Sequence, residues 1–123
     1  MGGEFFNDVA MLSKPFRVFT CKGVKIKECQ GRNEFWSYVQ QRMGMRKHHH
    51  VKELRLRVVS SLTIFRIEFA NGDYMEREYP NPTIIVDWLT TQEYVYGKPV
   101  FIDGEPAGNL SKDNAKLMEL LTI

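Results

Sequence analysis

The segment from Arg42 to Arg57, R-M-G-M-R-K-H-H-H-V-K-E-L-R-L-R, concentrates the side chains best suited to chemistry. It carries six Lys/Arg residues, three consecutive histidines and one acid, Glu53. Lysine and arginine bind phosphates by releasing counterions from a polyanion, without a required spacing. We therefore take the basic residues of this stretch as candidate ligands of a nucleic acid.

Further candidates come from a hairpin predicted over residues 16–29, turning at Lys22-Gly23. If its basic strand lies beside the strand predicted over residues 52–59, the outward cations of both strands form one patch. An aromatic side chain such as Tyr38 could then stack on an unpaired base. The predicted nucleic-acid-binding residues are Lys25, Lys27, Arg46, Lys47, Lys52, Arg55 and Arg57.

The triplet His48–His50 offers imidazoles for metal binding or for general acid–base catalysis. A zinc site needs three or four convergent ligands, and nothing fixes Cys29 or Glu53 as such a partner. Histidines beside arginines could support RNA cleavage, but no second motif accompanies them. We predict no metal site, no cofactor and no catalytic residue, and we expect a protein that is not an enzyme, with the role of the triplet left open.

Sequence motifs narrow the function further. No P-loop, G-x-G-x-x-G, G-x-S-x-G, H-E-x-x-H or C-x-x-C motif occurs. The segment V-F-I-D-G-E-P-A-G-N-L, Val100–Leu110, followed by a predicted helix, locally resembles the final hairpin and helix of glutaredoxins. The C-x-x-C motif and the preceding cis-proline turn of that family are missing, so the resemblance implies no redox function.

The 123 residues fit one domain covering residues 1–123. Charge is divided unequally along it. Residues 1–57 hold twelve Lys/Arg and five Asp/Glu, whereas residues 58–123 hold five and ten. A basic half attracts polyanions, and an acidic half attracts a basic partner.

Two cysteines, Cys21 and Cys29, indicate whether the protein resides in a reducing or an oxidising cellular compartment. On the predicted hairpin they lie at different distances from the turn, too far apart for a disulfide, whose Cα atoms are within ~7 Å. We expect free thiols in a reducing, cytoplasmic environment. No apolar run approaches the ~20 residues that cross a bilayer, so no membrane association is expected.

The predicted helices follow from caps and spacing. Asn33 is a candidate N-cap for a helix with Phe35, Val39 and Met43 on its apolar face, ending at Gly44. Arg42 and Arg46 near its C-terminus also suit the helix dipole without any ligand. Residues 1–12 form a short helix or a flexible end, residues 83–89 favour a helix over a strand, and a last helix follows Ser111.

The predicted strands follow from alternation. In the hairpin, Arg17 lies opposite Glu28, and an apolar face pairs Phe19 with Ile26 and Cys21 with Val24. In residues 52–59, the side chains of Leu54, Leu56 and Val58 point inward. In residues 62–70 the inward set is Thr63, Phe65, Ile67 and Phe69.

The hairpin at Asn71-Gly72 allows two registers. A two-residue turn sets Arg66 opposite Arg77, whereas a bulged three-residue loop sets Arg66 opposite Glu78 and Phe65 opposite Tyr79. Opposite charges favour the bulged register. A short strand over residues 100–102 ends in an Asp103-Gly104 turn.

These elements predict an α+β domain. Its antiparallel sheet comprises a hairpin and a three-stranded meander, with helices packed on one face. The function we expect is that of a small nucleic-acid-binding or regulatory accessory protein, its partner being DNA or RNA, with a basic sheet face. The alternative is a protein-interaction module, such as an inhibitor or adaptor of a larger enzyme. The sequence leaves the oligomeric state open.

Overall fold

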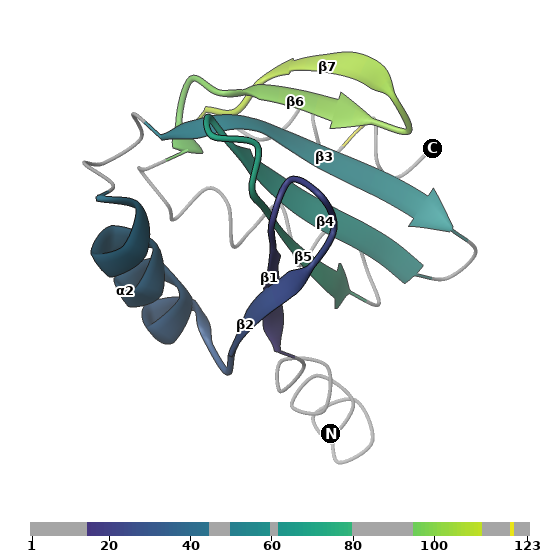
Figure 1. Ribbon diagram of the computed structural model, residues 1–123. Helices are drawn as coiled ribbons and strands as arrows, with labels where there is room; N and C mark the ends of the chain where they lie inside the picture. The colour runs from purple at the N-terminus through teal and green to yellow at the C-terminus, as the bar shows by residue number, and fades with distance from the viewer. Residues whose placement is uncertain (1–14, 45–49, 60–61, 80–94, 112–118, 120–123) are drawn as a thin grey trace, which may run out of the picture.

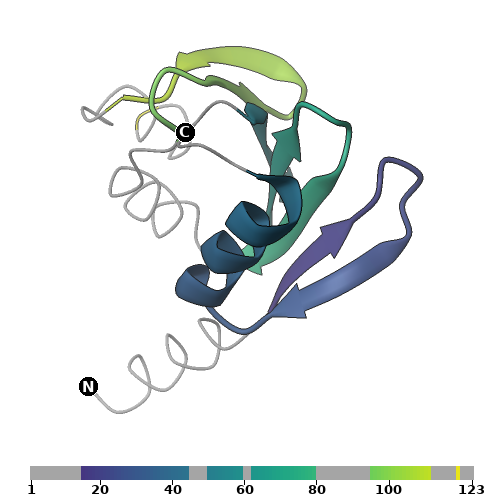
Figure 2. The ribbon, with the colours of Figure 1, turned by 60° about the vertical axis from the view of Figure 1, so that its left-hand side comes forward.

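The computed structural model describes residues 15–44, 50–59, 62–79, 95–111 and 119 (Figure 1). In this part of the chain, one helix, α2 (Arg32–Met43), covers one face of a seven-stranded sheet (Figures 1 and 2). The strands are β1 (Phe16–Phe19), β2 (Lys25–Cys29), β3 (Val51–Val59), β4 (Leu62–Phe69), β5 (Tyr74–Tyr79), β6 (Pro99–Ile102) and β7 (Glu105–Asn109). Their order across the sheet is β2-β1-β5-β4-β3-β6-β7.

The sheet is mixed, and the predicted fold class is therefore wrong. The hairpin β1–β2 and the meander β3–β4–β5 are antiparallel as expected, but β6 runs parallel to β3, with Leu54 beside Val100. Local alternation identifies strands but does not identify a non-local neighbour, so the sequence did not reveal this pairing. The helices predicted at residues 1–12, at 83–89 and after Ser111 fall outside the described residues, apart from Glu119, which is helical.

The helix α2 lies close to its predicted position. It begins one residue after Gly31, instead of at the predicted cap Asn33, and the amide of Gln30 donates to the Glu34 carboxylate at 3.0 Å. It ends at Gly44, whose φ of 59° is the left-handed conformation that glycine adopts readily. The predicted apolar face is confirmed at Phe35 and Val39, which are fully buried, and the side chain of Met43 lies outside the described residues.

The core lies between α2 and the sheet. The inward set of β4 is confirmed in full, since Thr63, Phe65, Ile67 and Phe69 are all buried. Leu54 and Leu56 of β3 are also buried, but Val58 is 41% exposed because β3 and β4 extend beyond the core at their hairpin.

The hairpin β1–β2 turns a different face to the core from the predicted one. Phe16, Val18 and Cys29 are fully buried, whereas Phe19 and Ile26 are only partly buried. Arg17 lies opposite Glu28 as predicted, but a bulge after Val18 sets Phe19 opposite Lys25 instead of Ile26. The bulge adds one residue to β2. Residues of β1 nearer the turn therefore pair with a different residue of β2 from the predicted one.

The register of β4 against β5 differs from both predicted registers. Arg66 lies opposite Glu76, and Phe65 opposite Arg77. The loop is Ala70–Gly72, because the amide of Phe69 donates to the Asp73 carbonyl at 2.9 Å. The Asn71 side chain accepts from the Asp73 amide at 3.0 Å, which fixes this turn.

This register places Arg77 in the core, where it is 4% exposed. Its guanidinium lies 4.4 Å from the ring centroid of Phe16 and 4.9 Å from that of Tyr79, and it donates to the Tyr79 hydroxyl at 3.3 Å. Aromatic faces and a hydroxyl thus surround the buried cation. Burial raises the pKa of Tyr79, and Arg77 partly opposes this shift.

The turns of the two hairpins meet at Gly72, and this contact makes a prediction about stability. A Cβ added at Gly72 would lie 3.0 Å from Cβ of Cys21, whereas one at Gly104 would have no neighbour within 4 Å. Both glycines have positive φ, so alanine at either costs about 1–2 kcal/mol of conformational strain. We expect Gly72→Ala to cost about 1 kcal/mol more than Gly104→Ala in urea unfolding. Equal losses would show that the two turns separate without cost.

The two thiols differ in access, which predicts their reactivity. Both cysteines are free as expected; Cys21 is exposed and Cys29 is buried, and burial raises the pKa of Cys29. We expect a disulfide-exchange reagent to modify one thiol in the native protein and the second only in denaturant. Cys21→Ser should remove the native reaction. Rapid native modification of the Cys21→Ser variant would contradict the burial of Cys29.

Candidate functional site on the open face

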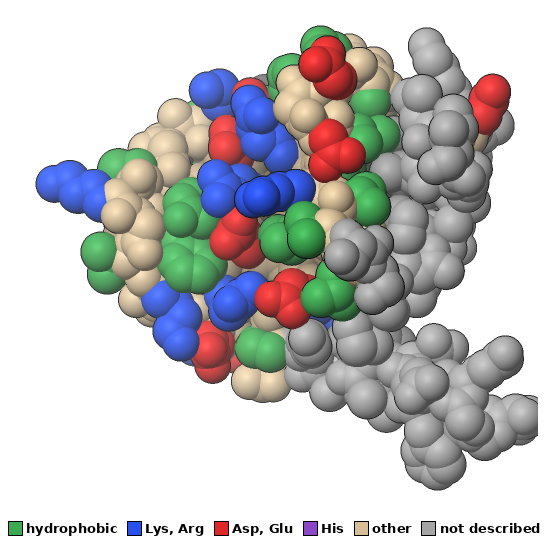
Figure 3. Space-filling view, turned by 90° about the vertical axis from the view of Figure 1, so that its right-hand side faces the viewer, with side chains coloured by type: hydrophobic (Ala, Val, Ile, Leu, Met, Phe, Trp, Pro, Cys, Tyr) green, Lys and Arg blue, Asp and Glu red, His purple; other side chains and the backbone are tan. Residues whose placement is uncertain are grey.

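The face of the sheet opposite α2 carries side chains that are exposed or only partly buried (Figure 3). Lys/Arg and Asp/Glu side chains interleave on it, with hydrophobic side chains between them (Figure 3). We call this surface the open face. Its residues are Arg17, Phe19, Glu28, Arg55, Arg57, Ile64, Arg66, Glu68, Tyr74, Glu76, Glu78 and Phe101.

A row of cross-strand neighbours crosses the open face. From β2 to β6 it runs Glu28, Arg17, Glu76, Arg66, Arg55, Phe101. Charges alternate along this row until two arginines face each other on β3 and β4. Like charges directly opposite are unfavourable, so this pair needs compensating acids.

Acids on three strands supply that compensation. Arg66 donates from Nε and Nη2 to one oxygen of Glu76, at 3.1 and 2.8 Å. Glu68 lies 3.5 Å from Nε of Arg55 and from Nη1 of Arg66, and Glu53 forms an ion pair with Arg55. Partial burial alone would lower the pKa of Arg66, but the hydrogen bond and charge of Glu76 outweigh it and raise the pKa.

Aromatic rings contact the guanidinium groups of Arg66 and Arg55. The guanidinium carbon of Arg66 lies 4.0 Å from the ring centroid of Tyr74, and that of Arg55 lies 4.6 Å from that of Phe101. Tyr74 in turn stacks on Phe19, with ring centroids 5.1 Å apart. Each of these arginines therefore has both acidic and aromatic neighbours, which restricts its orientation.

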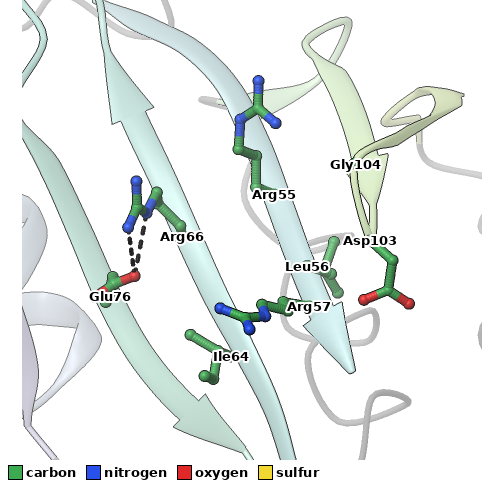
Figure 4. Close-up of a pocket in the computed structure, with 8 residues that line it drawn as sticks. All are labelled: Arg55, Leu56, Arg57, Ile64, Arg66, Glu76, Asp103 and Gly104. Atoms are coloured by element: carbon green, nitrogen blue, oxygen red, sulfur yellow. Dashed lines mark hydrogen bonds and ion pairs between the residues drawn. The ribbon is translucent and has the colours of Figure 1, made fainter. Parts of the chain in front are cut away.

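A hollow of about 400 Å³ lies over β3 and β4 beside the turn between β6 and β7 (Figure 4). Three arginines, two acids and an apolar side chain line most of it: Arg55, Arg57, Arg66, Glu76, Asp103 and Ile64. The Arg57 guanidinium lies over Ile64, whereas the Asp103 carboxylate lies on the other side of β3 (Figure 4). Among the described residues, Arg57 has no ion-pair partner within 4.0 Å.

The structure does not bring the five predicted nucleic-acid-binding residues that it describes into one patch. Arg55 and Arg57 lie on the open face, but β4, β5 and β1 separate their strand from β2. Lys25 pairs with Glu28 at 2.9 Å, and Lys27 lies 3.9 Å from Glu34 of the helix on the other face. Lys52 is exposed on β3, and Arg46 and Lys47 fall outside the described residues.

Sequence reasoning missed most of the open face. It did not identify Arg17, Arg66, Tyr74 or Phe101 as site residues, nor the hollow beside Asp103. Alternation in β4 and β5 assigned Arg66 and Glu76 to an outward face, but their pairing required the register. The position of Asp103 required the parallel pairing of β6 with β3.

The described ranges contain no group of three His, Cys, Asp or Glu side chains placed to hold a metal ion. His48 and His49 are outside those ranges, so their chemistry stays open. In the same part of the chain, no helix combines the length and the hydrophobicity needed to cross a bilayer.

Comparison with known protein families, curated proteins and solved structures finds no match. The function is therefore inferred from the geometry of the open face. That geometry consists of paired charges, aromatic rings and one arginine without an ion pair in the described part of the chain.

The pair of Lys25 and Glu28 makes a prediction about titration. The hydrogen bond and charge of Lys25 lower the pKa of Glu28 in the folded protein. A lowered folded-state pKa stabilises the fold above the ordinary glutamate pKa, and this contribution is lost as the pH falls through the folded pKa. We expect Lys25→Met to raise the pKa of Glu28 toward its ordinary value in a carbon-detected NMR titration. The control Lys22→Met, which changes an exposed lysine of the same hairpin, should leave it in place; equal effects would contradict the assignment.

Proposed function

We propose that this protein is a regulatory protein-interaction module, and that its open face binds a larger protein. The observation that carries the proposal is the pairing of charges across that face. Arg66 is bound to Glu76, Arg55 to Glu53 and Glu68, and Arg17 lies 3.7 Å from Glu78. A surface whose cations are already paired attracts a polyanion weakly, whereas interleaved charges suit a protein surface of complementary pattern.

The side chains of the open face also suit a protein partner. Arginine and aromatic residues are enriched at protein interfaces and dominate their binding energy. Here Tyr74, Phe101 and three arginines lie on adjacent strands, and the rings restrict the guanidinium groups of Arg55 and Arg66. Side chains that are already ordered lose less entropy on binding.

Nucleic-acid binding stays a second prediction, supported by the two exposed cations of β3, Lys52 and Arg57. Affinity for DNA or RNA through these cations would fall steeply with salt. The acids that line the same face make this function the less favoured one. The free thiols of Cys21 and Cys29 support a reducing, cytoplasmic location for either function.

A capture experiment tests the proposed function. The full chain would be immobilised and exposed to nuclease-treated lysate of the source cells. Phe101→Ala should reduce recovery of a partner about fivefold or more, because truncating an interface anchor costs at least about 1 kcal/mol. Val24→Ala, which changes a side chain 59% exposed next to the β1–β2 turn, should not. Unfolding curves would confirm that both variants fold.

Two results would contradict the proposal. In the first, the wild type and Phe101→Ala recover the same proteins in equal amounts, so the open face is not the contact. In the second, every protein captured from a parallel untreated lysate is lost from the nuclease-treated one, which indicates that a nucleic acid formed the link.

A further inference from the structure

We propose that the partner inserts one carboxylate, flanked by apolar side chains, into the hollow beside Arg57. This inference rests on the proposed function and specifies the chemistry of the bound segment. The occupant is an extended peptide segment of another protein with a single acidic residue at the contact.

The charges of the hollow indicate a single anion. The lining contains three arginines and two acids, and two of these arginines already have ion-pair partners. Arg66 is engaged by Glu76, and Arg55 by Glu53 and Glu68. The remaining cation is Arg57, for which no described residue provides an ion pair.

The second acid that lines the hollow, Asp103, is hydrogen-bonded to the backbone. One carboxylate oxygen of Asp103 accepts a hydrogen bond from the Val58 amide at 3.0 Å. The Asp103 amide donates to the Leu56 carbonyl at 2.8 Å. These contacts hold the carboxylate at the edge of β3, where it forms no ion pair with Arg57.

Apolar side chains surround Arg57 on the open face. Ile64 lies directly opposite it on β4, and the next pair toward the hairpin turn on the same face is Val59 with Leu62. Alternation places these two on the same side of the sheet as Arg57, and they are 43% and 37% exposed. A peptide carboxylate would form an ion pair with Arg57. An apolar side chain next to it in the peptide would pack against Ile64, Val59 and Leu62. Exclusion of water by the apolar contact strengthens the ion pair.

The surrounding acids favour a carboxylate over a phosphate chain. Glu78 lies opposite Ile64, and Glu76 and Asp103 line the hollow. A second negative charge next to the first would meet these carboxylates at short range. A nucleic acid brings successive phosphates, whereas a peptide can bring one acid followed by neutral residues.

Two blocked tripeptides test the inference as defined probes: N-acetyl-Leu-Glu-Leu-amide and its glutamine analogue. Both would be titrated into the full chain to about 10 mM, which detects even millimolar affinities, with NMR observation of the Arg57 side-chain N–H and the Ile64 methyl groups. The glutamate peptide should shift these signals and bind at least about threefold more tightly than the glutamine peptide, the size expected of one partly exposed ion pair.

Matched variants assign the effect to Arg57. Arg57→Gln should abolish the preference for glutamate, whereas Lys52→Gln removes the same charge from the same strand and should preserve it. Equal binding of the two tripeptides, absence of binding, or equal loss in both variants would overturn the inference. So would tighter binding of inorganic phosphate than of the glutamate peptide at the same signals.

The failure of this inference and that of the proposed function are distinguishable. If lysate capture depends on Phe101 but the tripeptides show no preference, the open face binds a protein through other chemistry. If the tripeptides bind as expected but capture does not depend on the open face, the hollow recognises carboxylates without serving the proposed partner.

Discussion

Backbone pairing of β4 with β5 determines which charged side chains meet on the open face and which lie opposite one another in the core. With the loop at Ala70–Gly72, Arg66 lies opposite Glu76 on the open face. Arg77 lies opposite Phe65 on the core side of the sheet. Both arginines are then stabilised, one by a carboxylate and one by aromatic rings. A one-residue slip would oppose Arg66 to Arg77 and set inward side chains against outward ones. The register therefore fixes the core and the candidate site together.

The elements themselves follow from local chemistry, which is why the sequence could predict them. The αL glycine at Gly44 ends α2, and strict alternation in β4 puts Phe65 and Ile67 in the core. The predicted β4–β5 register was off by two residues along β5. A shift of two keeps every side chain on its predicted face but exchanges its partner, so Arg66 meets Glu76 in place of Glu78. The loop has three residues as predicted, but it sets Phe69 opposite Asp73, which fixes the observed register.

The strand order of the sheet depends on pairing between strands that are distant in the sequence, and local sequence patterns do not predict such pairing. The parallel pairing of β6 with β3 brings Phe101 beside Arg55 and the Asp103 turn to the end of the hollow. The position of β2 at one edge of the sheet separates Lys25 and Lys27 from β3. The predicted basic patch assumed that these strands are neighbours. The candidate site was therefore predictable at Arg55 and Arg57 and not in its remaining members.

The pair of facing arginines, Arg55 and Arg66, breaks a local rule of sheet pairing. The sheet compensates with Glu53, Glu68 and Glu76 and with two aromatic rings, so the two cations need no external ligand. Arg57 lies one row away, exposed above Ile64, and no described acid forms an ion pair with it. Local rules are broken most often where a surface serves a function. The compensated pair lines the hollow together with Arg57, and Arg57 provides the charge through which we propose that a partner binds.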